Sequence, residues 1–253
     1  MSDSDTNTNA NTNAKQKKTR QKKKLGKAPR ELVDMSNPDK TRHEVYKPGQ
    51  NCIRFPKPFR CVILGKVNSG KSYLAKHILM AHQGCAPKFE EVHIVHGCAD
   101  THTTEYDLIE PTSISQEIPS YLDFDPMPHK LLILDDVDFT GMNQKDLKRI
   151  SELMRFGSSH CNLSVILMHQ AFFRIPKIVK DCSNVFIIFR PHDNDELASI
   201  GRRVGLKKKK IFDLFNDCLP EWRDSLLINL IPNAPHKFYK NLFTPIIEEV
   251  DSD

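Results

Sequence analysis

From about residue 59 onward, short and almost continuously apolar runs alternate with longer amphipathic segments. The apolar runs predict strands that are covered on both faces, at residues 60–64, 91–95, 130–134, 163–168 and 185–189. Helices are predicted between or after them at residues 71–82, 144–155 and 194–204. This alternation of strand and helix is typical of an α/β domain with a mainly parallel central sheet.

The last apolar runs, at residues 225–230 and 236–239, are separated by Ile231-Pro232-Asn233-Ala234-Pro235. Two prolines and an asparagine between apolar runs are typical of a turn. We therefore expect a C-terminal antiparallel hairpin that is added to the sheet.

The N-terminal part of the chain lacks this pattern. Residues 1–30 begin with Asn, Thr, Ser and Asp and continue with Lys, Arg and Gln, so they cannot bury enough apolar surface to fold alone. We expect a disordered tail over residues 1–30 and a linker over 31–57. The folded domain is expected at 58–245, and an acidic end at 246–253.

Basic charge is concentrated in the tail. The formal net charge is +5, but residues 1–30 carry nine Lys or Arg and two Asp, a local charge of +7 that leaves the remainder at −2. The cations of residues 15–24 could be a nuclear-import signal, an arm that binds nucleic acid, or only a solubilising tail. Nucleic-acid binding by the folded part must come from local patches.

Cysteine usage and hydropathy indicate an intracellular protein without a membrane span. The seven cysteines are scattered singly, which suits reduced thiols. His96, Cys98 and His102 are close in sequence, but no second cluster completes a zinc site. No apolar run approaches the ~20 residues that cross a bilayer, and the N-terminus has no apolar signal core.

The clearest motif follows the first predicted strand. Lys71 and Ser72 end the segment Gly65-Lys66-Val67-Asn68-Ser69-Gly70-Lys71-Ser72, which matches G-x-x-x-x-G-K-[ST] and precedes a predicted helix. Its glycines let backbone N–H groups and the helix N-terminus face phosphates. Lys71 is expected to reach the β- and γ-phosphates, and the Ser72 hydroxyl to bind Mg²⁺. The sequence therefore predicts a P-loop NTPase that binds a nucleoside triphosphate with Mg²⁺.

Two acids, Asp135 and Asp136, follow the predicted strand at 130–134, which we expect to lie beside the P-loop strand. Asp135 would bind Mg²⁺ through its water shell, and Asp136 is the candidate base that orients the attacking water. Many motor ATPases carry Glu in the second place, so Asp136 is one methylene shorter. As an alternative, Asp136 caps a turn or helix, and this explanation is favoured for Asp138.

Polar residues also follow the predicted strand at 163–168. The carboxyl ends of parallel strands line the ligand site in open α/β sheets, so Gln170 could sense the γ-phosphate or help to place water. His169 is better explained as a histidine whose hydrogen bonds are satisfied at the strand end.

A longer set of residues carries a resemblance to a known family. It comprises the P-loop, Asp135-Asp136, the run from Arg155 to Ile166, and Gln170-Ala171-Phe172-Phe173. These residues resemble the FtsK/HerA-superfamily genome-packaging ATPases, above all those of virophages, Polinton-type elements and related large double-stranded DNA viruses. The resemblance covers about residues 58–245. The chain differs from the family pattern at Ser159, Ala171 and Lys177.

The resemblance implies a RecA-like fold and a homo-oligomeric ring that drives double-stranded DNA into a preformed viral capsid by ATP hydrolysis. Capsid vertex proteins would be partners, and the site of action would be a viral factory or the host nucleus, with the virion as a further location. Each active site would lie between subunits, and Arg155 is the first candidate for a cation that enters the neighbour's site. The alternative for Arg155 is a surface arginine at a helix C-terminus, where the macrodipole favours a cation.

A basic cluster in the folded region could contact DNA phosphates without reading bases, or could simply be solvated surface. Its members are Arg202, Arg203, Lys207, Lys208, Lys209 and Lys210. Two rival functions share the nucleotide motifs. One is another FtsK/HerA-type DNA pump or helicase, and the other is a nucleotide-binding structural protein of the virion with little turnover.

Overall fold

The fold is taken from a computed structural model, which describes residue 46 and residues 55–80, 88–97, 103–191 and 193–247. The expected tail therefore lies outside the described residues, as do most of the expected linker and the last six residues. Within the described part, no helix is both long and apolar enough to span a bilayer.

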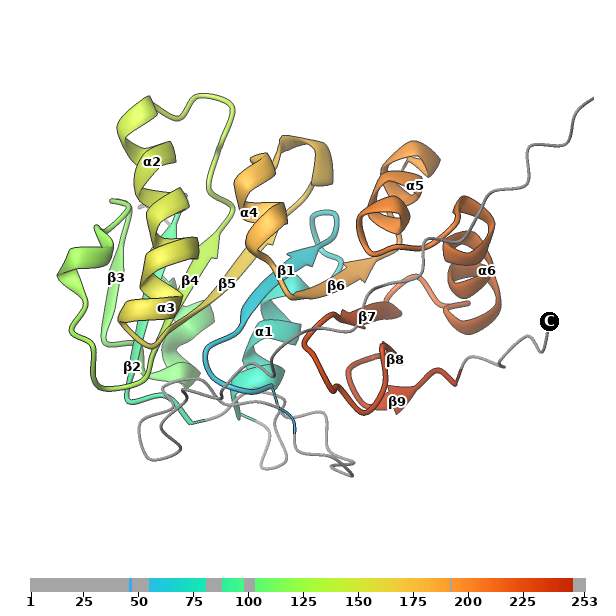
Figure 1. Ribbon diagram of the computed structural model, residues 1–253, viewed down its shortest axis with the longest axis horizontal. Coiled ribbons are helices and arrows are strands. Elements are labelled where there is room, and N and C mark those ends of the chain that lie inside the picture. Colours follow the sequence, from blue (N-terminus) through green and yellow to red (C-terminus); the bar gives the residue numbers. More distant parts are fainter. Residues whose placement is uncertain (1–45, 47–54, 81–87, 98–102, 192, 248–253) are drawn as a thin grey trace, which may run out of the picture. The chain divides into compact units, whose positions relative to one another are not determined.

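The protein is built on a nine-stranded sheet in the order β3-β2-β4-β5-β1-β6-β7-β8-β9 (Figure 1). The strands are β1 (Arg60–Leu64), β2 (Glu91–His96), β3 (Ser113–Ser115), β4 (Lys130–Asp135), β5 (Leu163–His169), β6 (Val185–Phe189), β7 (Ser225–Asn229), β8 (Phe238–Lys240) and β9 (Thr244–Pro245). Neighbours from β3 to β6 run parallel, whereas those from β6 to β9 run antiparallel. The α/β class, the mainly parallel sheet and the C-terminal hairpin are thus confirmed.

Helices cover both faces of this sheet. They are α1 (Lys71–Met80), α2 (Gln144–Glu152), α3 (Ser158–His160), α4 (Lys177–Cys182), α5 (Asn194–Arg203) and α6 (Lys208–Cys218), with 3-10 turns η2 (Thr103–Ile109), η3 (Tyr121–Asp123) and η5 (Phe172–Arg174). Successive strand residues point to opposite faces. In β1, Val62 therefore joins the core beneath α2, α5 and α6, while Ile63 joins the core on the α1 side.

Two aromatic residues from the segment expected to be a linker belong to the core on the α1 side. Tyr46 and Phe55 are both buried there. The Tyr46 phenol oxygen accepts a hydrogen bond from Asn229 Nδ2 at 3.0 Å, and the Phe55 ring centroid lies 5.1 Å from that of Phe59. Residues before position 58 therefore contribute to the packing of the domain.

The order of the central strands differs from the expectation. β5 lies between β1 and β4, so the prediction that the Asp135 strand is beside the P-loop strand is wrong. Ile166 of β5 has Cys61 of β1 as its partner on one side and Ile133 of β4 on the other. Which parallel strands become neighbours depends on how the crossover connections pack, and the apolar pattern of a strand does not encode this. As a result, Gln170 emerges between the P-loop and the two acids.

The helix predicted at 144–155 continues further along the chain. α2 passes into a π-helical turn, η4 (Leu153–Gly157), and then into α3, which ends at a C-cap on Cys161. The Ser159 hydroxyl donates to the carbonyl oxygen of Arg155 at 2.8 Å, and the Ser158 hydroxyl to that of Leu163 at 2.8 Å. Arg155 is therefore inside a helical run and not at a C-terminus, so the macrodipole does not explain its position.

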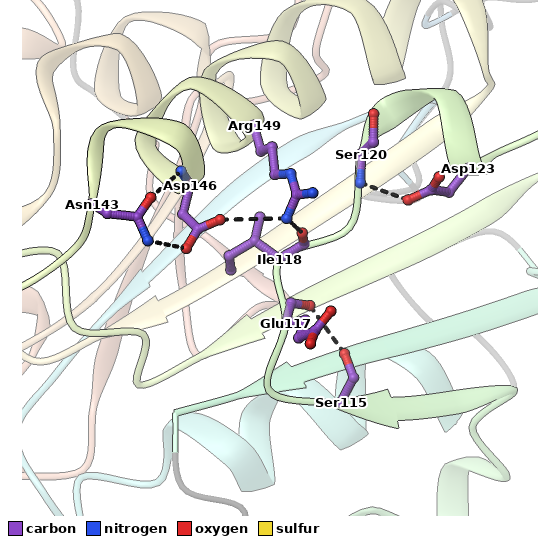
Figure 2. A network of polar contacts seen from close by, with 8 residues as sticks. All are labelled: Ser115, Glu117, Ile118, Ser120, Asp123, Asn143, Asp146 and Arg149. Carbon is purple, nitrogen blue, oxygen red and sulfur yellow. Dashed lines mark hydrogen bonds and ion pairs between the residues drawn. The ribbon is translucent and has the colours of Figure 1, made fainter.

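A polar network fixes the start of α2 (Figure 2). Asn143 caps the helix, because its side-chain oxygen accepts from Asp146 N at 2.9 Å while its amide donates to Asp146 Oδ2 at 2.8 Å. From the same helix, the Arg149 guanidinium donates to the carbonyl oxygen of Ile118 at 3.0 Å. This contact ties α2 to the segment between β3 and η3. The network thereby anchors the C-terminal end of the β4–α2 connection, which begins at Asp136.

Candidate nucleotide site

The P-loop joins the carboxyl end of β1 to the first turn of α1. Gly70 has a φ of +102° and Asn68 a φ of +61°. Both values lie in the left-handed region, which favours glycine and tolerates asparagine. Ser69 N donates to the carbonyl oxygen of Lys66 at 3.2 Å and closes the turn. α1 therefore starts at Lys71 behind a tight loop of backbone amides, an arrangement that suits phosphate binding.

Lys71 is held against the inside of this loop. Its side chain is buried, and Nζ donates to the carbonyl oxygens of Gly65 at 2.9 Å and Lys66 at 3.0 Å. Phosphate oxygens are stronger partners for an ammonium than carbonyl oxygens, because the hydrogen bond then joins opposite charges. The Ser69 hydroxyl is also buried and makes no hydrogen bond with the described residues. A buried polar group of this kind calls for a partner such as a ligand oxygen or water.

Asp135 ends β4 and is only 4% exposed. The Tyr106 hydroxyl, from η2, donates a hydrogen bond to its Oδ2, and His96 Nε2 lies 3.6 Å from the same oxygen. Tyr106 belongs to no motif that would mark it in the sequence, and His96 stands out there only as a member of the incomplete zinc set. Cys98 and His102, the other members of that trio, lie outside the described residues.

Asp136 leaves the strand end with a φ of +47°, and its side chain is exposed. Gln170 Nε2 donates to Asp136 Oδ2 at 3.2 Å. Behind it, Gly97 packs so closely that a Cβ there would lie 2.3 Å from the Asp136 carbonyl oxygen. A left-handed non-glycine residue costs free energy, and such residues cluster at functional sites. The two residues that sequence analysis proposed for the attacking water, Asp136 and Gln170, are thus in direct contact.

A cavity of about 610 Å³ gathers most of these groups. Its lining consists of Val67, Asn68, Gly70, Lys71, Ser72, Tyr73, His96, Asp135, Asp136 and Arg223. Ser72 and Asp135 offer oxygen atoms to this one space, and hard cations such as Mg²⁺ bind oxygen ligands. Over the described residues there is no cluster of three or more His, Cys, Asp or Glu for a metal. The donor set therefore fits an ion that takes several ligands from phosphates and water.

Solved structures with a similar fold include viral packaging enzymes. The genome packaging NTPase B204 of Sulfolobus turreted icosahedral virus 2, in complex with sulfate, is 20% identical with a TM-score of 0.53, covering 76% of this chain and 99% of B204. B204 of Sulfolobus turreted icosahedral virus, a DNA-packaging ATPase, is 18% identical with a TM-score of 0.53, covering 76% and 100%. The virus 2 protein with AMPPCP is 19% identical with a TM-score of 0.52, covering 76% and 99%.

The chain has a P-loop ATPase fold. At the level of fold, the resemblance stated from the sequence is confirmed. No protein-family profile matches the chain, and no curated protein matches it either.

Two titratable groups near the carboxyl ends of β4 and β5 of this P-loop ATPase fold are engaged in local structure. His169 Nδ1 accepts a hydrogen bond from Ala171 N at 3.0 Å, and burial is the main cause that lowers the pKa of His169. The ring is therefore neutral at pH 7. Asp138 accepts from Thr140 N at 2.8 Å, and this hydrogen bond lowers the pKa of Asp138. Both residues act as caps at the ends of strands or turns.

Arg155 lies away from the nucleotide cavity of its own chain. The helical run that contains it leads into Leu163, the first residue of β5, whereas the nucleotide edge is at the other end of this strand, beyond His169. A strand of seven residues spans about 20 Å. The Arg155 side chain is exposed, with its guanidinium 5.3 Å from the Phe156 ring centroid. A role of Arg155 in a neighbouring subunit's site stays a prediction.

The basic cluster is also at the edge of the sheet opposite the P-loop. The last turn of α6 lies at the nucleotide edge, because Arg190, just after β6, donates to the carbonyl oxygens of Phe215 at 2.9 Å and Leu219 at 2.8 Å. The first turn of α6, which begins with Lys208, therefore lies at the other edge. Three lysines of the cluster and Arg202 are exposed, while Arg203 pairs with Asp181 of α4.

Proposed function

We propose that the protein hydrolyses ATP to move double-stranded DNA into a viral capsid. The observation that carries this proposal is the convergence of Lys71, Asp135 and Asp136 on one cavity, with Gln170 bonded to Asp136. The fold shared with B204 over nearly the whole of that protein supports genome packaging as the purpose of the hydrolysis. The same proposal includes a ring of subunits in which Arg155 of one subunit lies near the nucleotide site of the next. It also includes contact with capsid vertex proteins.

Each residue of the site has a separate proposed role in ATP hydrolysis. The loop amides and Lys71 would hold the β- and γ-phosphates. Ser72 and Asp135 would hold Mg²⁺, which supplies neutralising charge on the phosphates when bound. Tyr106 orients the Asp135 carboxylate through its hydroxyl. Asp136 would orient the attacking water and accept its proton, and Gln170 would keep Asp136 in place.

The basic cluster is the proposed DNA contact. Lys208, Lys209 and Lys210 occupy the first turn of α6, and this first turn contains no acidic residue. The positive end of a helix dipole disfavours cations, so this arrangement lowers stability unless an anion compensates. DNA phosphates are such an anion. Because the cluster lies at the opposite edge of the sheet, DNA bound there leaves the nucleotide cavity open.

The first test is ATP hydrolysis by the full chain with long linear duplex DNA, with single-stranded DNA of the same length, and without DNA. We expect duplex DNA to stimulate turnover several-fold, and single-stranded DNA to stimulate it less. Stimulation by single strands alone would favour a helicase. ATP binding without hydrolysis under all three conditions would favour a structural protein of the virion.

A second test addresses the DNA contact. Replacing Lys207, Lys208, Lys209 and Lys210 by Gln should weaken duplex binding and reduce the slope of log K against log salt by up to about 3.6, since each neutralised phosphate contributes about 0.9. Turnover without DNA should not change. A surface control replaces Lys145 and Lys148 of α2 by Gln, both of which are exposed and lie outside the cluster. An unchanged salt slope in the cluster variant would contradict this contact.

A further inference from the structure

A second cavity, of about 540 Å³, lies beside the P-loop on the side of β6. Its lining consists of Asn68, Ser69, Gly70, Tyr73, Leu74, His77, Phe189, Arg223, Ser225, Asn241, Leu242 and Phe243. Asn68, Gly70, Tyr73 and Arg223 also line the cavity that holds Lys71, Asp135 and Asp136. The two spaces therefore meet at the P-loop and at Arg223.

The walls of this second cavity are mainly apolar and come from three parts of the fold. Phe189, at the end of β6, is buried and lies under the loop, where a Cβ on Gly70 would be 3.9 Å from its ring. Tyr73 and His77 of α1 form another wall, with ring centroids 5.3 Å apart. The turn between β8 and β9 supplies Leu242, which is buried, and Phe243, which is 47% exposed.

The turn that supplies the third wall is held in a demanding conformation. Asn241 and Leu242 have φ values of +48° and +71°, in the left-handed region. The Asn241 side chain fixes the turn, since its oxygen accepts from Ser225 N at 2.8 Å and its amide donates to Asp224 Oδ1 at 2.7 Å. Lys240 adds an ion pair of 2.9 Å to Asp224. Leucine rarely adopts this conformation, so Leu242 beside an anchored Asn241 marks a built wall, not a loose surface turn.

We propose that this cavity receives the nucleobase and ribose of the nucleotide whose phosphates lie in the P-loop. The inference rests on the proposed ATPase function. A purine is a flat and largely apolar body, and a cavity of 540 Å³ lined by aromatic rings is within the size range of small-molecule sites. Arg223, which lines both spaces with its guanidinium 4.6 Å from the Trp222 ring centroid, lies where the sugar and α-phosphate pass between them.

The same geometry predicts weak discrimination between bases. A site rejects the wrong base strongly when it holds hydrogen-bonding groups that only the correct base satisfies. The Asn241 amide, one of the lining groups able to read a purine edge, already bonds Ser225 and Asp224. Stacking and apolar contact depend little on which purine is present. ATP and GTP should therefore bind with affinities within about tenfold of each other.

The test compares Mg·ATP and Mg·tripolyphosphate binding by calorimetry, because tripolyphosphate has the phosphates but no base. Phe243→Ala should weaken Mg·ATP about tenfold and leave Mg·tripolyphosphate within about twofold, since only the base loses its apolar partner. Phe243→Tyr should restore most of the ATP affinity. The matched control is Phe173→Ala, which removes a ring that is 56% exposed and lines neither cavity.

Equal weakening of both probes by Phe243→Ala, or no weakening of ATP, would overturn the inference. An unmodified protein that binds tripolyphosphate as tightly as ATP would do the same. Failure of the proposed function has a different signature. If the unmodified chain binds neither probe, the P-loop does not hold phosphates, and if it binds both without hydrolysis under any DNA condition, the motor proposal fails while the base cavity stands.

Discussion

Replacing Asp136 by Asn should slow ATP hydrolysis by about 10²- to 10⁴-fold, the usual contribution of a general base. The substitution keeps the size of the side chain, and Asn tolerates the left-handed backbone that Asp136 adopts. ATP affinity should therefore change by no more than about threefold, so the variant should accumulate bound ATP. Single-turnover hydrolysis and equilibrium ATP binding measure the two quantities separately.

The control for Asp136 lies two residues further along the chain. Asp138→Asn removes a carboxylate that bonds Thr140 N and lines neither cavity, so hydrolysis should remain close to normal. If Asp136→Asn hydrolyses ATP at the normal rate, Asp136 is only a cap at the strand end. If both variants lose activity equally, the loss comes from the connection between β4 and α2 and not from a catalytic base.

Lys71→Met should weaken ATP binding by about tenfold or more and make hydrolysis undetectable. Methionine approximates the aliphatic stem but carries no charge, so the phosphates lose a charge-assisted hydrogen bond worth about 1.5–3 kcal/mol and a charge that stabilises the transition state. The fold should persist, because the variant removes a buried cation whose present partners are the carbonyl oxygens of Gly65 and Lys66. Binding and turnover are measured as for Asp136, and thermal unfolding checks the fold.

Lys76→Met serves as the control for Lys71, since it removes a lysine of α1, the helix that Lys71 begins. The Lys76 side chain lines neither cavity. Near-normal hydrolysis is expected. Full activity of Lys71→Met would rule out the P-loop as the phosphate site.

Apolar patterning predicted the buried strands well and the exposed elements poorly. β1 and β6 begin and end where the pattern placed them, because β6 is apolar along its whole length and β1 is apolar and buried after Arg60. β3 was missed, since its three residues Ser113–Ser115 are all exposed and give no pattern of burial. α6 was not predicted, because three lysines occupy its first turn and give no amphipathic pattern there. Further along, Ile211, Leu214 and Phe215 do have the i, i+3, i+4 spacing of a buried helical face.

The residues of the candidate site also fall into those that could be predicted from the sequence and those that could not. Motifs that are contiguous in sequence, such as the P-loop and Asp135-Asp136, could be assigned because each carries its own chemistry. Groups that reach the site from distant segments could not. Tyr106 meets Asp135 only after η2 packs beside α1 and β4, and Phe243 lines the base cavity only because the β8–β9 turn folds back toward Asn68.

α5 connects the two ends of the molecule that the proposal assigns to different tasks. Near its start, Glu196 accepts a hydrogen bond from Phe172 N, two residues beyond Gln170, and its last turn carries Arg202 and Arg203. A helix of ten residues is about 15 Å long and resists bending over that distance. A tilt imposed at Phe172 when the γ-phosphate leaves would therefore reappear as a displacement at the basic cluster. In mechanical terms, α5 would act as a rigid rod between the proposed hydrolysis site and the proposed DNA contact.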